Sequence, residues 1–315
     1  MEQNKTAAKY KVLKWVGGVL GVILILVGIA SIYISSKWKP VLTEKLKQGV
    51  RDGSGGMYNL DFKDIHLNII TGTAILDSVR LLPDTAIYNQ LRKAGDAPAN
   101  IYRVELSHLK FARIGILTAY FKKKVEMNAI VLDRPSIDII HFNVPKRPDT
   151  IKEERTLYQQ ISKTLKSIHV KAIRVIDADL DYVNGTNYKP LNSVKHLNIN
   201  VKNLLIDSLS QFDTTRVFHA KDINFELTGY RSTGKDKMYT IKVDTISGSV
   251  AAKTIDVVGV QMIPLHPDLE FTRKYKYGKD RYDLKFNQIS FSGVDFIGLN
   301  KNSKLHAQAI TIGPA

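Results

Sequence analysis

The sequence predicts a mainly β protein, in which an N-terminal transmembrane helix precedes an elongated, curved antiparallel β-sheet that forms a repeating groove with a few short helices. Three observations support this fold class. Residues 15–36 carry no charge and are mostly apolar. From residue 58 onward, apolar residues alternate with polar ones, which is typical of β-strands. The same alternating motif returns later in the chain at a fixed spacing, as it does in proteins built from repeats.

The uncharged run at residues 15–36 is the first expected element. At about 1.5 Å per residue this helix would span roughly 33 Å, enough for the ~30 Å hydrocarbon core of a bilayer. A cleaved signal peptide is the alternative, because Gly28 and Ala30 have the spacing of a cleavage site. Positive charge before the run predicts that residues 1–14 form a cytoplasmic tail. The lysines concerned are Lys5, Lys9, Lys11 and Lys14.

Residues 37–145 are expected to form a first β-groove unit. Pro40 opens a short helix, which the glycine-rich segment 51–56 ends. Strands follow, beginning with the motif MYNLDFKDIHL at 57–67, in which Tyr58, Leu60 and Phe62 share one face. The apolar phase then steps over Lys63 and Asp64 to residue 65. We expect a β-bulge there that keeps the apolar residues on one face.

Residues 238–315 are expected to form a second unit of the same kind. Placing Tyr58 on Tyr239 and Tyr102 on Tyr282 aligns the two segments at nearly equal offsets. A short helical turn is predicted in each unit, near 114–121 and 294–299. The ending HAQAITIGPA corresponds to a segment of the first unit that continues into a further strand, so the sequence predicts a fragment of a longer array.

Residues 146–237 are expected to hold a linker helix and the middle strands. An amphipathic helix of about 14 residues is predicted from the stripe of Leu157, Ile161 and Leu165. Strands are predicted at 168–183, 194–205 and 217–227. One face of the first two is apolar throughout, which fits either a packed β-sandwich core or a sheet whose apolar face stays partly open.

Composition limits the possible functions. The chain has no cysteine, which excludes a disulfide framework, a thiolate metal site and a cysteine nucleophile. Its formal net charge is +16, from 46 Lys+Arg and 30 Asp+Glu. Such an excess favours anionic polymers or anionic lipid surfaces as partners, and a solvated basic surface is the alternative.

Two motifs resemble known sites but lack essential residues. The segment GYRSTGKD at 229–236 is close to a phosphate-binding loop, but Asp236 stands in the place of the hydroxyl residue and a strand follows. We therefore predict a hairpin loop. Asp177, Asp179 and Asp181 could face one side of a strand as a cation site, but the glycine and glutamate of a calcium loop are missing. A solvated strand face is the preferred interpretation.

Histidines and a basic segment complete the candidates. The eight histidines show no metal-ligand spacing, so the sequence gives little support for a metal site. The segment FTRKYKYGKDRYDLK at 271–285 mixes basic residues with tyrosines. Nucleic-acid binding, contact with anionic headgroups and a solvated loop are all compatible with it, and the solvated loop is preferred.

The chain resembles AsmA-like envelope proteins, of the kind found in Bacteroidota. The resemblance lies in the single N-terminal span, in KWKPVLTEKL, in GMYNLDFKDIHLNIITGTAILDSVRLLPD and in ARIGILTAYFKKKVEMNAIVLDRPSIDII, above all in the I-V-L-x-x-P-x-I-x-I rhythm at 130–139. It implies an inner-membrane anchor, a periplasmic β-groove like that of chorein-type bridge-like lipid transfer proteins, and phospholipid movement toward the outer membrane. The chain departs from the family in length, because this array is too short to cross a periplasm alone.

The expected function is therefore collective and not catalytic. The expected partners are membrane phospholipids and other envelope proteins, with no nucleic acid, no small-molecule substrate, no cofactor and no metal. A structural or scaffolding envelope protein with closed β faces remains the alternative. The residues expected to face acyl chains are Tyr58, Leu60, Phe62, Tyr102, Val104, Leu106, Tyr239, Ile241, Tyr282, Leu284 and Phe286.

Overall fold

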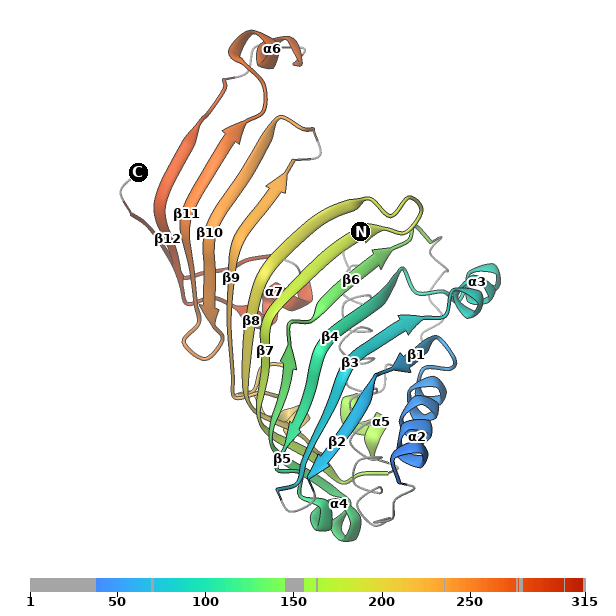
Figure 1. The fold of residues 1–315 in the computed structure, drawn as a ribbon. Helices are drawn as coiled ribbons and strands as arrows, with labels where there is room; N and C mark the ends of the chain where they lie inside the picture. Colours follow the sequence, from blue (N-terminus) through green and yellow to red (C-terminus); the bar gives the residue numbers. More distant parts are fainter. Residues whose placement is uncertain are drawn as a thin grey trace.

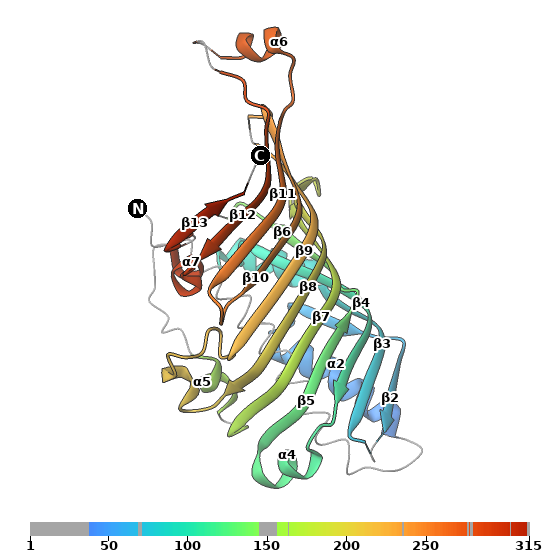
Figure 2. The ribbon, with the colours of Figure 1, turned by 90° about the vertical axis from the view of Figure 1, so that its left-hand side faces the viewer.

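The computed structural model describes residues 38–313, apart from 69–70, 145–155, 163, 235, 276, 278–279 and 303. These residues form one large mixed sheet of 13 strands that is strongly twisted and curved (Figures 1 and 2). The prediction of a mainly β fold is confirmed. The strands are β1 (Tyr58–Asp61), β2 (Asp64–Asn68), β3 (Thr73–Pro83), β4 (Asn100–Ala112), β5 (Lys124–Asp133), β6 (Ser136–His141), β7 (Ser167–Asn184), β8 (Pro190–Ile206), β9 (Asp222–Thr233), β10 (Tyr239–Ser249), β11 (Thr254–Pro264), β12 (Leu284–Ser292) and β13 (Ala309–Ile312).

Short helices connect or cover the strands. They are α2 (Trp38–Gly53), α3 (Thr85–Ala94), α4 (Ile116–Lys122), α5 (Leu157–Ile161), α6 (Asp268–Arg273), α7 (Phe296–Asn302) and the 3₁₀ turn η1 (Ser210–Phe212). None of the helices between residues 38 and 313 is both long and apolar enough to cross a membrane. The span expected at 15–36 and the tail at 1–14 lie outside the described residues.

The strand order corrects the expected antiparallel sheet to a mixed one. β7 pairs in parallel with β5 along its first half and with β6 along its second half. The cause is that β5 and β6 are two parts of one line, interrupted at Arg134, whose backbone is left-handed (φ 47°). The chain then returns to the end where β5 began before it enters β7. The other strand pairs are antiparallel, and the sheet continues through the hairpin between β9 and β10.

A line of irregular backbone, here called the seam, crosses the sheet from β1 to β12. At the seam the apolar face advances by three residues instead of two, for example from Leu76 to Val79. The expected bulge at Lys63 is corrected, because the register of β1–β2 against β3 is unchanged on both sides of the break (Asp61 with Arg80, Asp64 with Asp77). The chain leaves the ladder between β1 and β2 instead, opposite the left-handed Ser78 within the continuous strand β3. The left-handed seam residues are Ser78, Arg134, Asp177, His196, Gly229 and Gly259.

Helices α2 and α5 close the apolar face over the first strands. Leu42, Leu46 and Val50 of α2 are fully buried and belong to one hydrophobic cluster with the strand residues. Ile161 of α5 joins the same cluster. The core of the molecule therefore lies between these helices and strands β1 to β7. This cluster includes Tyr58, Leu60, Phe62, Ile65, Leu76, Leu109, Phe111, Ile130 and Val170.

Several predicted boundaries are wrong. The helix expected over about 14 residues has only the five residues of α5, because the chain turns after Ser162 and Lys166 N–H already donates to the Lys123 carbonyl (2.7 Å). The strand expected from residue 217 begins at Asp222, and Val217 makes only an isolated bridge to Ala220. The predicted helical turns near 114–121 and 294–299 are present as α4 and α7.

Candidate functional site

The candidate site is the apolar face of the sheet. Residues opposite one another in a β-ladder share a face, so the strand register determines which side chains are neighbours. One row of register partners crosses the whole sheet and contains no polar residue. It consists of Ile65, Leu76, Leu109, Leu132, Val175, Ile199, Phe225, Gly248, Ile255, Phe291 and Ile310. We call it the continuous row.

Gly248 is the one member of the continuous row without a side chain, and its neighbours explain why. A Cβ at this position would lie 2.5 Å from the ring of Phe225, which covers the glycine. The same ring meets Phe296 of α7 edge-on, with 6.5 Å between centroids. Phe225 thus fills the gap in the row and receives the short helix α7 on the apolar face.

The register brings two predicted site residues, Leu60 and Val104, into a second row across the first strands. Leu60 pairs with Leu81, Leu81 with Val104, Val104 with Ile137, and Ile137 with Leu180. Other predicted residues lie in neighbouring rows on the same face, in pairs such as Tyr102 with Ile139 and Leu106 with Val79. In the second unit, Ile241 and Leu284 both pair with Met262, and Phe286 pairs with Val260.

Exposure on this face rises along the chain. Tyr58, Leu60, Phe62 and Leu106 are buried, Tyr102 and Val104 are half-buried, and so are Tyr239 and Phe286. Ile241, Tyr282 and Leu284 are exposed. In the continuous row, Leu76 is 0% exposed and Ile310 is 59% exposed. The predicted site residues therefore share a face but fall into a covered group and an open group.

The two units repeat the same backbone contacts. The backbone N–H of Tyr102 donates to the Tyr58 hydroxyl oxygen (3.1 Å), and the N–H of Tyr282 donates to that of Tyr239 (3.2 Å). Left-handed residues also recur at equivalent positions. The pairs are Gly56 and Lys237, Gly72 and Lys253, Ser78 and Gly259, and Arg113 and Gly293.

Burial changes the tyrosine pKa values in the covered group. Desolvation raises the pKa of Tyr58 to about 12 and that of Tyr102 to about 12. A phenol with its ordinary pKa of about 10 is already neutral at physiological pH, so the raised values reflect the burial of these side chains and not a change of charge. The pKa of Tyr282 is also raised, but chiefly by the nearby charge of Asp280.

The opposite face of the sheet is polar. Asp77 accepts from His66 (2.9 Å) and lies 3.6 Å from His108, which lies 3.4 Å from Asp133. The three carboxylates considered as a cation site are paired with basic side chains. Lys195 lies 3.2 Å from Asp179 and 3.1 Å from Asp181, and His196 lies 2.7 Å from Asp177, a hydrogen bond that raises the His196 pKa.

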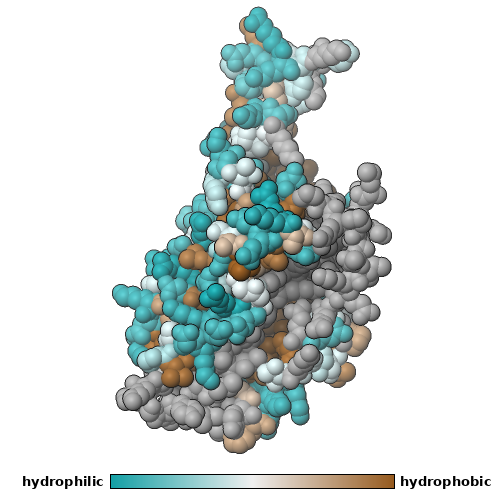
Figure 3. Space-filling model, turned by 90° about the vertical axis from the view of Figure 1, so that its right-hand side faces the viewer, coloured by the Kyte–Doolittle hydropathy of each residue, from teal (hydrophilic) through white to brown (hydrophobic). Residues whose placement is uncertain are grey.

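The remaining sequence candidates lie in turns. The segment GYRSTGKD forms the end of β9 and the turn into β10, as predicted, and Met238 N–H donates to Asp236 there. The basic segment begins in α6, a helix that was not predicted. The connection from β11 to β12 that contains α6, here called the α6 hairpin, projects from one end of the molecule (Figure 3).

Sequence reasoning missed the continuous row. None of its eleven residues was among the predicted site residues, which lie in neighbouring rows. The apolar periodicity of the row was visible, but only the pairing register shows that its residues form one line. The chain matches no known family model, and no curated protein is similar to it in sequence.

Proposed function

We propose that this chain is an AsmA-like envelope protein, anchored in the bacterial inner membrane through residues 15–36, whose periplasmic β-groove holds lipid acyl chains. On this proposal it contributes to phospholipid transport toward the outer membrane and has no enzymatic activity. The resemblance of the sequence to that family supports the proposed location in the cell envelope. The apolar face of the sheet supports acyl chains as the bound molecules.

The observation that carries the proposal is the continuous row. It crosses eleven strands without a polar side chain, whereas the opposite face carries ion pairs and hydrogen bonds along much of its length. A soluble protein seldom leaves a contiguous apolar patch open unless something binds to it. Acyl chains fit such a surface because they need no hydrogen-bond partners and can lie along several rows at once.

Cargo contact is proposed for strands β10 to β13, where the apolar face is most exposed. Ile241, Leu284, Ile310 and Ile312 each expose more than a third of their surface there. Over the first strands, helices α2 and α5 already occupy the face. That cover is the observation that favours the alternative, a scaffolding protein with a closed core, for the first part of the sheet.

Site-specific photo-crosslinking in membranes tests the proposal. A photoreactive amino acid replaces either Leu284 or Lys285, neighbours on β12 whose side chains point to opposite faces. Irradiation precedes solubilisation, so detergent cannot displace a bound lipid. Mass spectrometry of the purified full chain should find phospholipid adducts at position 284 and none at position 285.

Two charge variants provide the matched control. Leu284→Asp places a carboxylate on the apolar face, and Asn287→Asp adds the same charge at an exposed position of the seam. Native mass spectrometry should show less co-purified phospholipid with the first variant only. A wild-type chain that carries no lipid, together with no adduct at position 284, would refute the proposal and favour the scaffolding alternative.

A further inference from the structure

The loop between β8 and β9 displays two apolar side chains to solvent. Leu209 is 76% exposed and Phe212 is 75% exposed, on either side of the buried Ser210. They lie at the end of the sheet where β4 and β8 finish, here called the lower end, which also carries α4 and lies at the foot of Figure 1. Single exposed apolar residues are common on protein surfaces, but two large ones on one loop make that loop a candidate contact site.

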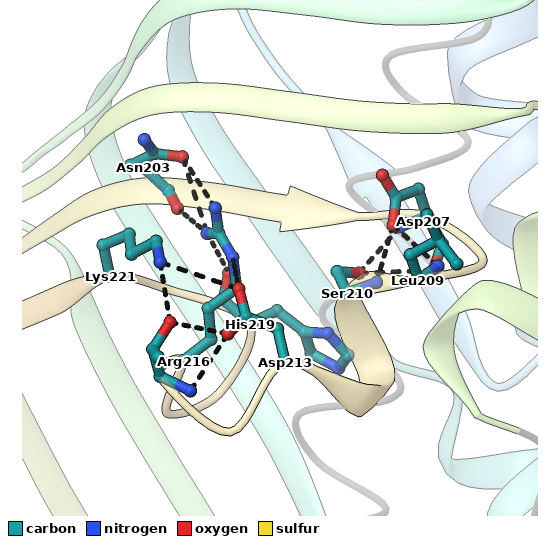
Figure 4. Close-up of polar contacts among 9 residues, drawn as sticks. Asn203, Asp207, Leu209, Ser210, Asp213, Arg216, His219 and Lys221 are labelled. Atoms are coloured by element: carbon teal, nitrogen blue, oxygen red, sulfur yellow. Dashed lines mark hydrogen bonds and ion pairs between the residues drawn. The ribbon is translucent and has the colours of Figure 1, made fainter.

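The loop is held in one shape by polar contacts and not by a hydrophobic core. The Arg216 side chain donates to the carbonyls of Asn203 (2.6 Å) and His219 (3.2 Å) and pairs with Asp213 (3.0 Å), as Figure 4 shows. Asp207 accepts from the N–H groups of Leu209 (3.0 Å) and Ser210 (2.7 Å). The two apolar side chains are therefore fixed outward, and their exposure is a property of an ordered loop.

Exposed lysines lie at the same end of the sheet as this loop. Lys122, Lys123 and Lys124 are all exposed and follow Phe121, whose side chain is also mostly exposed at the end of α4. No carboxylate among the described residues forms an ion pair with these three lysines. Lys166, just before β7, is exposed at the same end. Apolar and basic side chains together are typical of surfaces that enter the headgroup region of an anionic bilayer.

The direction of α2 points to the same end. Lys39, near its start, bonds Asp64 at the beginning of β2 (3.0 Å), whereas Ser54, just past its end, accepts a hydrogen bond from Tyr58 N–H (3.0 Å) at the beginning of β1. β1 and β2 run toward the lower end, so α2 begins nearer to it than it ends. Trp38, the first described residue, therefore lies on that side.

The opposite end of the sheet also combines exposed apolar and basic residues, since Arg273 and Lys274 follow Leu269 at the end of α6 and are exposed. On the α6 hairpin, Leu269 is 74% exposed, about as much as Phe212. Its neighbours Asp268 and Glu270 are exposed carboxylates, with side chains 85% and 66% accessible. An anionic membrane would repel them. The two ends thus present similar apolar exposure, and both carry basic and acidic residues, so the two ends must be compared directly to show which one meets a membrane.

We propose that the lower end of the sheet docks on an anionic phospholipid bilayer, with Leu209 and Phe212 inserted at the headgroup boundary and Lys122–Lys124 on the lipid headgroups. The sheet would then stand on the membrane with the α6 hairpin pointing away from it. This docking goes beyond lipid binding on the apolar face and does not require cargo there.

Single-cysteine labelling tests the docking, because the full chain has no cysteine of its own. Phe212→Cys and Leu269→Cys are labelled with an environment-sensitive dye, and the full chain is studied in bilayer nanodiscs of phosphatidylcholine and phosphatidylglycerol. The label at 212 should shift to the blue, lose access to aqueous iodide several-fold, and be quenched by acyl-chain nitroxide lipids. The label at 269 should stay accessible to iodide.

The charge requirement is tested in the same discs. Lys122→Gln combined with Lys124→Gln should reduce the shift at 212, and so should discs of phosphatidylcholine alone. Equal iodide access at 212 and 269 would overturn the proposal, and so would lipid quenching of 269 instead of 212. The photo-crosslinking at position 284 is a separate readout, so a failed docking test leaves the groove proposal standing.

Discussion

The two copies of the repeat have the same backbone but different surroundings. In each, a tyrosine hydroxyl near the start of one strand accepts from the N–H of a second tyrosine, and left-handed residues recur at equivalent positions. In the first copy the apolar face is buried beneath α2 and α5. In the second copy, the equivalent of Leu60 is Ile241, which is 43% exposed.

This difference shows that the repeated strand motif determines the direction of the apolar side chains, whereas other segments determine their burial. The strand motif sets the direction of the apolar side chains, and it does so equally in both copies. Burial depends on separate segments that pack on the face, and these flank the first copy. A repeated β-surface can therefore serve as a core in one place and as a binding surface in another without a change of strand chemistry.

The largest expected effect is the response of the two copies to a charge on the apolar face. Leu60→Asp should abolish folding, because an unpaired carboxylate would be buried under α2. Ile241→Asp, at the equivalent position of the second copy, should leave the chain folded and lower its bound lipid. Circular dichroism and gel filtration of both full-length variants measure the folding, and native mass spectrometry measures the lipid.

A matched surface change distinguishes charge from position. Asn59→Asp adds the same charge beside Leu60 on the exposed face of β1, and it should cost far less than Leu60→Asp, because water reaches it even though it loses the Asn59 hydrogen bond to Asp84. If Ile241→Asp unfolded the chain as Leu60→Asp does, the second copy would have to be covered, and the proposed cargo surface would be lost.

Truncating an equivalent aromatic residue gives a smaller, graded comparison. Phe111 on β4 is fully buried, and its counterpart Phe291 on β12 is half-buried. Phe111→Ala should lower the free energy of unfolding by about 3–5 kcal/mol. Phe291→Ala should cost roughly 1–2 kcal/mol, because less apolar surface leaves water there. Urea unfolding of the full chain, followed by circular dichroism, provides both values.

An equal loss of unfolding free energy in the two alanine variants would contradict the difference in burial between the two copies. Measurements with added phospholipid test the same difference in a second way. Bound acyl chains would stabilise only the folded state, so lipid should raise the stability of the wild type more than that of Phe291→Ala. The stability of Phe111→Ala should rise with lipid as much as that of the wild type.

The sequence predicted the strands and the apolar face well, because strand periodicity is a local signal. Alternation at Tyr58, Leu60 and Phe62 identified the face directly, and the shared offset located its counterpart at Tyr239. The step at Lys63 was visible too, but its nature was not. A bulge in one strand and a seam that crosses many strands give the same pattern in the sequence of one strand. Only the left-handed Ser78 on the partner strand distinguishes them.

The rest could not be predicted because it depends on contacts distant in sequence. The parallel pairing of β7 with β5 follows from the path of a connection and not from residue pattern. The covered and open parts of the apolar face carry the same residue types, so exposure had no sequence signal. Helix α3 was not predicted although the sequence contains signals for it, because Asp84 caps its start and Gly95 caps its end.

The smallest expected effect concerns two equivalent tyrosines whose pKa values are raised for different reasons. Burial raises the pKa of Tyr102 to about 12, whereas the charge of Asp280 is the main cause for Tyr282. Asp280→Asn should therefore move the Tyr282 pKa back toward its ordinary value of about 10 and leave Tyr102 unchanged. Nuclear magnetic resonance of the full chain with labelled tyrosine follows both titrations.

The sign of the pH effect follows from the direction of the Tyr102 shift. The unfolded chain loses this phenolic proton near pH 10, before the folded chain does, so the contribution of Tyr102 to stability is complete below pH 10. It is lost as the pH rises from 10 to about 12. Because the cause is burial, the titration reports directly on the cover over the first copy. A Tyr102 pKa near 10 would mean that water reaches this face in both copies, and that α2 and α5 do not distinguish them.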